Sequence, residues 1–175
     1  LMVMGPEEIP ELIKLIHTLP KNDTEHKRLN NYKILEQKQE AKEKASDNIE
    51  FLYASNIQIG FHSDYLSQID RIYELVNRTN QLNYTKVRSS KEEIIGICSD
   101  QSVQSGYITV KDKYGDYGIV GFYAIKENKL LHFLFSCRVI GQGVEQYVYA
   151  KLGYPQLKVV GEVISQITLD DAPSW

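Results

Sequence analysis

The sequence has little cysteine, no long apolar run and no cluster of metal-binding side chains. Two cysteines among 175 residues are too few for a disulfide framework, so we expect a protein of the reducing cytoplasm. Every apolar run falls short of the roughly 18 residues that a membrane span needs. The first residues also lack the basic segment that opens a secretory signal. The histidines and cysteines do not show zinc spacing, which predicts no metal site.

An excess of positive charge is also missing. The formal net charge is −3, which argues against nucleic acid as the main partner. By contrast, 42% of the residues are hydrophobic and 12 are tyrosines, which is enough for a hydrophobic core. A chain of this length typically forms one domain. We therefore expect a single folded domain with an extension.

Residues 1–54 have the composition of that extension. Prolines interrupt the first 20 residues, where a short helix is expected over residues 10–17. Residues 21–54 predict one long helix, capped by Asp23 or Thr24, in which basic and acidic residues alternate in equal number. A helix this polar is typical of a connector between domains. A coiled-coil or dimer helix is the alternative, although no heptad persists.

Residues 55–175 carry the patterns of the folded domain. Alternating polar and apolar residues predict a strand over residues 56–61. Apolar residues at helical spacing predict a helix from residue 65 to 75 or beyond. A capping box, Ser90-Lys91-Glu92-Glu93, then opens a second, short helix that ends near Cys98.

The second half of this domain predicts a sheet crossed by one helix. Three strands joined by short turns are expected over residues 106–110, 119–125 and 130–137. A helix over 144–152 follows, and the apolar run 157–163 predicts a strand parallel to its predecessor. This order predicts an α/β fold of the α+β kind, with a mixed, mostly antiparallel sheet and helices on both faces.

The connection between the last of these three strands and its helix is the best candidate for a binding site. Two glycines, Gly141 and Gly143, follow Arg138 at short spacing. Glycine lets the backbone approach a ligand closely, and the first amides of a helix bind anions such as phosphate. The pattern therefore indicates a phosphate site. A tight strand-to-helix turn without any ligand explains the two glycines equally well.

The spacing R-x-x-G-x-G over residues 138–143 resembles the pyrophosphate loop of GNAT-type N-acyltransferases. Three longer stretches resemble the C-terminal GNAT-like half of FkbH-like proteins and occur in that family's order: NRTNQLNYT (77–85), KDKYGDYGIVG (111–121) and SCRVIGQGVE (136–145). Those proteins carry a HAD-type domain upstream of this half. The resemblance implies the GNAT-like acyl-CoA N-acyltransferase fold for residues 55–175.

The resemblance also implies a ligand, acetyl-CoA or another acyl-CoA, or the phosphopantetheine arm of an acyl carrier protein. In GNAT proteins this arm inserts beside the central strand like an extra strand, so that backbone groups near Ser136 and Cys137 would face the thioester. The implied cofactor-binding residues are Ser136, Arg138, Val139, Ile140, Gly141, Gln142, Gly143 and Val144.

Three residues are candidates for catalysis, each with a plainer interpretation. Glu162 interrupts an apolar run, as a base in the cleft or as a residue at a strand edge. Cys137 is a nucleophile or a small buried side chain. Asn80 is part of a polar wall for the acceptor or pantetheine arm, or bonds its own backbone in a turn. Asp116 is favoured as a turn residue over a site residue, and His132 as a packed or solvent-facing residue over a catalytic one.

FkbH-like proteins are associated with loading a glyceryl-type group onto an acyl carrier protein, in polyketide, other secondary-metabolite or polysaccharide biosynthesis. That chemistry belongs to the HAD half, whose D-x-D motif is absent from this sequence, so no glyceryl loading or magnesium site is expected. Two functions remain: an acyltransferase, or a non-catalytic module that docks the carrier protein for an upstream HAD-like domain. After Ser165 the sequence departs from the GNAT pattern, so the C-terminal elements are expected to be truncated or different.

Overall fold

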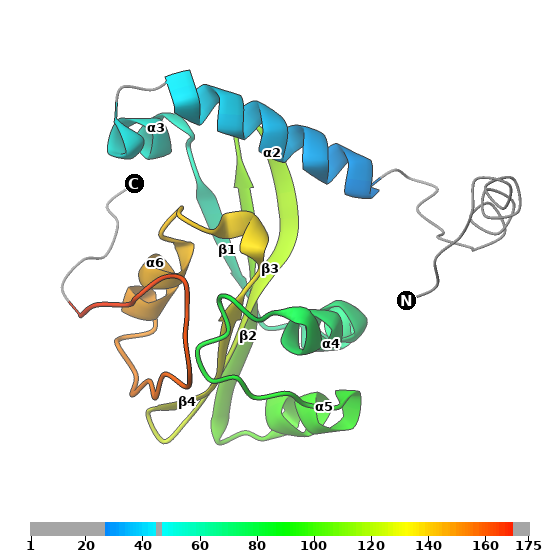
Figure 1. The fold of residues 1–175 in the computed structure, drawn as a ribbon. Helices are drawn as coiled ribbons and strands as arrows, with labels where there is room; N and C mark the ends of the chain where they lie inside the picture. Colours follow the sequence, from blue (N-terminus) through cyan, green and yellow to red (C-terminus); the bar gives the residue numbers. More distant parts are fainter. Residues whose placement is uncertain (1–26, 45–46, 170–175) are drawn as a thin grey trace, which may run out of the picture. The chain divides into compact units, whose positions relative to one another are not determined.

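The computed structural model describes residues 27–44 and 47–169 (Figure 1). The chain divides into two units, Leu1–Lys33 and Ile34–Trp175, and the first is described only from Lys27 onward. The folded sheet lies in the second unit. Two expectations lie outside the described residues: the helix over 10–17 and the cap at Asp23 or Thr24.

The long helix predicted over residues 21–54 is wrong in its extent. The structure has α2 over Lys27–Lys44 and a separate helix α3 over Asn48–Ala54. Asp47 has an extended backbone, and its side chain accepts a hydrogen bond from the Ile49 amide at 3.2 Å. An aspartate in this position satisfies a free amide and starts a new helix. The connector therefore contains two helices, and the second begins directly after the extended residue Asp47.

The first part of the domain follows the predicted order. Strand β1 spans Gln58–His62, a short 3-10 turn η2 spans Tyr65–Gln68, and helix α4 spans Ile69–Arg78. Helix α5 spans Lys91–Ser99, and the predicted capping box between the Ser90 and Glu93 side chains and backbone is confirmed. This box fixes where α5 begins because it satisfies two amides that the helix leaves unpaired.

Three more strands complete the sheet. They are β2 over Val103–Asp112, β3 over Gly115–Lys126 and β4 over Lys129–Phe135. The strand order is β1-β2-β3-β4, and each neighbouring pair is antiparallel. Glu127 and Asn128 both have positive φ, at 49° and 61°, as a two-residue hairpin between right-twisted strands requires. The predicted three-strand meander is confirmed.

Helices cover both faces of this sheet, as predicted (Figure 1). Buried residues of α4 and α5 pack on one face, against Phe122 and Leu134 of the sheet. Helix α6, over Val144–Lys151, packs on the other face, against Val120, Phe133 and Phe135. Ile34 and Leu35 of α2 join this second cluster. The arrangement confirms the α+β class.

The predicted parallel strand over residues 157–163 is wrong. In the described residues the only parallel pairing is a single bridge between Lys129 and Gln156, so the sheet is antiparallel throughout. The outer edge of β4 is already used: the Tyr84 amide donates to the Phe133 carbonyl at 3.0 Å, and the Phe135 amide donates to the Leu82 carbonyl at 2.9 Å. A following strand has no free ladder to join there.

The segment after α6 is held by side-chain hydrogen bonds and by separate backbone hydrogen bonds, and it does not form a strand. The Tyr84 hydroxyl donates to the Ser165 carbonyl at 3.0 Å, and the Ser165 hydroxyl donates to Glu145 Oε1 at 2.6 Å. The Ile164 amide donates to the Gln81 carbonyl at 3.1 Å. Residues 157–169 therefore run as an irregular strap, tied to α6 on one side and to the segment after α4 on the other.

His132 on β4 is part of the core. Its ring is 1% exposed, tilts against Phe122 at 5.6 Å between ring centroids, and lies 3.3 Å from the Ser89 hydroxyl through Nε2. Nδ1 is buried without a partner. Burial lowers the pKa of His132 from 6.5 to about 4, because the charged ring would lose its hydration. The packed interpretation of His132 agrees with this environment.

The neutral form of His132 should make stability depend on pH. A histidine whose pKa is lower in the folded state stabilises the fold fully above pH 6.5 and progressively less as the pH falls toward 4. We expect this window to cost roughly 3 kcal/mol of unfolding free energy. Urea unfolding at several pH values measures how the unfolding free energy changes with pH. In the His132→Gln variant the decrease between pH 6.5 and pH 4 should be smaller by this amount. Equal slopes for both proteins would contradict the prediction.

Candidate functional site

The loop after β4 turns twice before α6 begins. Ser136 stays bonded to the sheet, its amide donating to the Val120 carbonyl at 2.6 Å. A 3-10 turn η3 spans Cys137–Val139. Within the loop the Ile140 amide donates to the Cys137 carbonyl at 3.2 Å, and the Gln142 amide donates to the Val139 carbonyl at 3.3 Å. Part of the backbone proposed to hold a phosphate is therefore used by the loop itself.

The remaining loop amides belong to the glycine end. Gly141 and Gly143 have φ of 72° and 70°, a conformation that favours glycine. Among the described residues, no acceptor lies within hydrogen-bond range of the amides of Gly141, Gly143 and Val144. Gly141 is exposed, and a Cβ added to it would meet nothing within 4 Å. A side chain at Gly141 would therefore extend into open space.

Arg138 ties this loop to strand β3. Its guanidinium donates to the Tyr117 carbonyl at 2.6 Å and to the Ile119 carbonyl at 3.1 Å, and its Nε donates to the Ser136 hydroxyl at 3.2 Å. Burial lowers the pKa of the guanidinium, which stays charged at neutral pH. Among the described residues no carboxylate forms an ion pair with Arg138. Carbonyl and hydroxyl oxygens accept its hydrogen bonds, and the charges of Glu74 and Asp116 act on it from beyond ion-pair distance.

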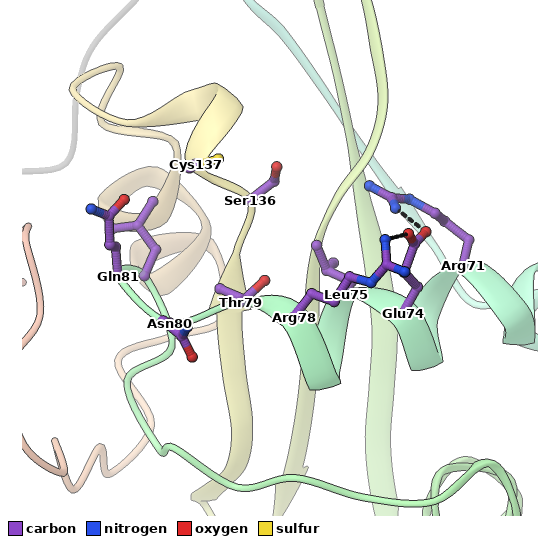
Figure 2. A pocket seen from close by; sticks show the side chains of 10 residues that line it. Arg71, Glu74, Leu75, Arg78, Thr79, Asn80, Gln81, Ser136 and Cys137 are labelled. Carbon is purple, nitrogen blue, oxygen red and sulfur yellow. Dashed lines mark hydrogen bonds and ion pairs between the residues drawn. The ribbon is translucent and has the colours of Figure 1, made fainter. Parts of the chain in front are cut away.

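A hollow of about 470 Å³ lies between this loop and helix α4 (Figure 2). We call it the α4 hollow. Three of the predicted site residues line it together: Asn80, Ser136 and Cys137. Its other lining residues are Arg71, Glu74, Leu75, Arg78, Thr79, Gln81 and Leu82.

The charged residues of the α4 hollow were not singled out from the sequence. Glu74 accepts from Arg71 and from Arg78, the latter at 2.5 Å, as the dashed lines in Figure 2 show. These residues stand three and four apart on α4, which places them on one helix face. The sequence alone shows that Arg71, Glu74 and Arg78 share one face of α4. Only the packing of α4 beside the loop shows that this face lines the same hollow as Ser136 and Cys137.

Ser136 and Asn80 differ in how they face the α4 hollow. The Ser136 oxygen accepts from both the Arg138 amide and Nε, so its own hydroxyl proton remains to be donated elsewhere. The Asn80 side-chain oxygen accepts from Arg88, and Figure 2 shows this side chain turned away from Ser136 and Cys137. Ser136 is therefore the better placed donor of the two.

Glu162 lies apart from both the loop and the α4 hollow. It sits in the irregular strap, is exposed, and its backbone carbonyl accepts from Lys86 Nζ at 2.8 Å. Asp116 likewise lies elsewhere, where its carboxylate accepts from the Gly118 amide at 2.7 Å, in the manner of a turn residue. The structure does not bring Glu162 together with Cys137 and Asn80.

A second hollow, of about 140 Å³, lies on the other side of the loop, toward α2 and α3. We call it the α2 hollow. The loop contributes Arg138, Ile140, Gly141 and Gln142, and Cys137 lines this hollow as well as the α4 hollow. The helices contribute Leu35, Lys38, Gln39, Lys42, Asn48, Phe51 and Leu52. The two hollows therefore meet at Cys137, whose side chain is exposed.

A buried ion pair holds the α2 wall of this second hollow. Lys38 Nζ donates to Asp112 Oδ2 at 2.5 Å, and the two side chains are 9% and 0% exposed. The Tyr117 hydroxyl donates to the same carboxylate at 2.9 Å, and its ring lies 4.9 Å from Lys38 Nζ. Burial lowers the pKa of Lys38, and the hydrogen bond and charge of Asp112 oppose this. The pair fastens α2 to the β2–β3 hairpin.

A third hollow, of about 600 Å³, lies over β1 and β2 and is lined by His62, Thr109 and Asp116, among others. His62 Nε2 lies 2.8 Å from the Thr109 hydroxyl, and its ring stacks on Tyr107 at 4.9 Å between centroids. A Cβ at Gly60 would collide with both partners of this hydrogen bond.

Across the described residues no group of histidine, cysteine and carboxylate side chains is arranged to hold a metal ion.

Comparison with protein-family models, with curated proteins and with solved structures finds no match to this chain. Among the helices that the structure describes, none combines the length and the apolar character needed to cross a membrane.

The buried ion pair between Lys38 and Asp112 should account for most of the stability that α2 adds to the fold. Replacing Lys38 by Met leaves the Asp112 charge buried without its cation, which we expect to cost about 3 kcal/mol of unfolding free energy. Lys42→Met, one turn along the same helix but exposed, should change it by less than about 0.5 kcal/mol. Urea unfolding of both variants measures the difference, and equal stability of the two would contradict this role.

The two cysteines should react at different rates. Cys137 is exposed, whereas Cys98 is half-buried and burial raises the pKa of its thiol. We therefore expect iodoacetamide to modify Cys137 first in the native protein, by at least tenfold in rate. Peptide mass spectrometry identifies the modified site, and Cys137→Ser should remove the fast phase. A fast phase that maps to Cys98 would refute the exposure described here.

Proposed function

We propose that this domain binds the phosphopantetheine thioester of an acyl-CoA or an acyl carrier protein, and that it transfers the acyl group. The observation that carries the proposal is the loop between β4 and α6, where two hollows meet at Cys137. One hollow is lined by Gly141 and by three basic side chains, which suits a phosphate. The other is larger and holds polar donors, as a thioester and its acceptor need.

The order of elements supports the same proposal. One strand, two helices, a three-strand meander, a glycine-containing loop and a helix follow one another. This is the order expected of a GNAT-like domain from the resemblance of residues 77–85, 111–121 and 136–145. A role in the biosynthesis of polyketides, other secondary metabolites or polysaccharides, a cytoplasmic location and a HAD-like domain upstream rest on that resemblance alone. A dimer formed through the connector helices is part of the same proposal.

The chemistry assigned to the α4 hollow is attack on a thioester. The nitrogen or oxygen of an acceptor bonds to the carbonyl carbon, the resulting oxyanion collapses, and the carbon–sulfur bond breaks to release the thiol. The acceptor proton passes to the leaving thiolate through solvent. The Ser136 hydroxyl is the donor available to the oxyanion. Glu162 is exposed and lies outside the α4 hollow, and Glu74 is the carboxylate that lines it.

A second function is favoured by the covered edge of β4. Leu82 and Tyr84 bond to Phe135 and Phe133, at the edge where a pantetheine arm would add as an extra strand. An arm that cannot pair there is held less firmly for reaction. The alternative is therefore a non-catalytic module that docks the carrier protein and presents its arm to an upstream HAD-like domain.

Ligand binding separates this proposal from a fold without a site. We expect acetyl-CoA, CoA or a holo acyl carrier protein to raise the melting temperature with the logarithm of ligand excess. The stabilisation should reach about 2.7 kcal/mol at 100 times the Kd. Gly141→Asp should weaken binding tenfold or more, because a carboxylate would face the phosphate. Gly141→Asn is the matched control, since Asn and Asp share size and tolerance of positive φ.

The outcome also separates the two functions. Turnover of the thioester, followed by mass spectrometry, supports the acyltransferase. Binding of the holo carrier protein without turnover, and with little binding of free CoA, supports the docking module. If none of the three ligands binds to the wild-type protein, both are wrong.

A further inference from the structure

The α2 hollow is lined by three basic residues, and none of its lining residues is acidic. The charge of Lys38 is cancelled by Asp112. Lys42 and Arg138, in contrast, form no ion pair with any carboxylate in the described part of the chain. The charges of Glu74 and Asp116 act on Arg138 only from beyond ion-pair distance. Two cations without an ion-pair partner, one from α2 and one from the loop, line the same small space and attract an anion.

A buried acceptor in the same hollow points to a ligand independently. Gln142 is 5% exposed, and its side-chain nitrogen donates to the Arg138 carbonyl at 3.0 Å. That bond assigns the amide orientation and leaves Oε1 buried without a partner among the described residues. An unpaired buried acceptor destabilises the fold, because it has lost its hydrogen bonds to water. A ligand that brings a hydrogen-bond donor next to its negative charge would remove this cost.

Size and polarity narrow the ligand further. At about 140 Å³ the α2 hollow has less than a third of the volume of the α4 hollow, which is about 470 Å³. It is small for a whole cofactor and suits one phosphate group with a few neighbouring atoms. Leu35, Phe51, Leu52 and Ile140 supply apolar walls beside the cations. A phosphate ester on a short, branched, hydroxyl-bearing chain meets all of these requirements.

We infer that α2 and α3 form one half of this anion site, and that Lys42 binds the phosphate from the side opposite the loop. The inference rests on the proposed function and gives the connector a part in it. The phosphate end of phosphopantetheine has the required chemistry, because dimethyl and hydroxyl groups follow its phosphate ester. The helices that precede the domain would then contribute ligand contacts, in addition to joining it to another domain.

The experiment compares ligands with and without the phosphate. Calorimetric titration of the full chain with 4′-phosphopantetheine and with pantetheine isolates the phosphate contribution. Lys42→Gln should weaken 4′-phosphopantetheine binding about tenfold, the value of one hydrogen bond to a charged group. It should leave pantetheine binding unchanged, and Lys42→Arg should restore most of the loss. Lys33→Gln is the matched control, an exposed lysine of α2 outside the hollow.

The outcomes distinguish this inference from the proposed function. If Lys42→Gln and Lys33→Gln bind 4′-phosphopantetheine like the wild type while Gly141→Asp does not, the loop binds the phosphate alone and the inference is wrong. If the wild-type protein binds neither 4′-phosphopantetheine, CoA nor holo carrier protein, the proposed function fails as well. Repeating the Lys42→Gln comparison with CoA and with holo carrier protein shows which source of the phosphate the site accepts.

Discussion

The buried contact between Lys38 and Asp112 positions the part of the molecule that the hydrophobic effect cannot hold. Helix α2 has few apolar residues, and among its described side chains Ile34 and Leu35 pack against the core. A polar helix is normally left in solvent. Here an ammonium group is buried against a carboxylate and a tyrosine, and burial of either charge is tolerable only while the other is present. The α2 wall of the smaller hollow exists because of this pair.

The outer edge of β4 is the second constraint. A strand that ends a sheet carries a row of unpaired backbone groups, which another segment tends to cover. The residues after α4 cover it, through Leu82 and Tyr84, and the strap after α6 is bonded to these residues in turn. Under the proposed function, the pantetheine arm would approach β4 beside the loop and through the α4 hollow. The side chains available to it there would be those of Ser136, Cys137 and α4.

Elements with local causes were predictable from the sequence. The capping box at Ser90, the hairpin at Glu127–Asn128 and the end of α6 before Gly153 all follow from residues within one or two turns of each other. The two errors have non-local or competing causes. Asp47 starts a new helix in a segment whose charge pattern continues unbroken. The apolar run 157–163 had the composition of a strand, but the edge it needed was already paired.

The sequence by itself determined the order of the elements and the presence of an open glycine loop before α6, because turns, caps and positive-φ positions depend on neighbouring residues. Only the tertiary structure decided what faces that loop. It brought Arg71, Glu74 and Arg78 to one side and Lys42 to the other, and it left Glu162 exposed away from both hollows. The physical reason is that packing of α2 and α4 depends on contacts between residues far apart in the chain, which no local pattern records.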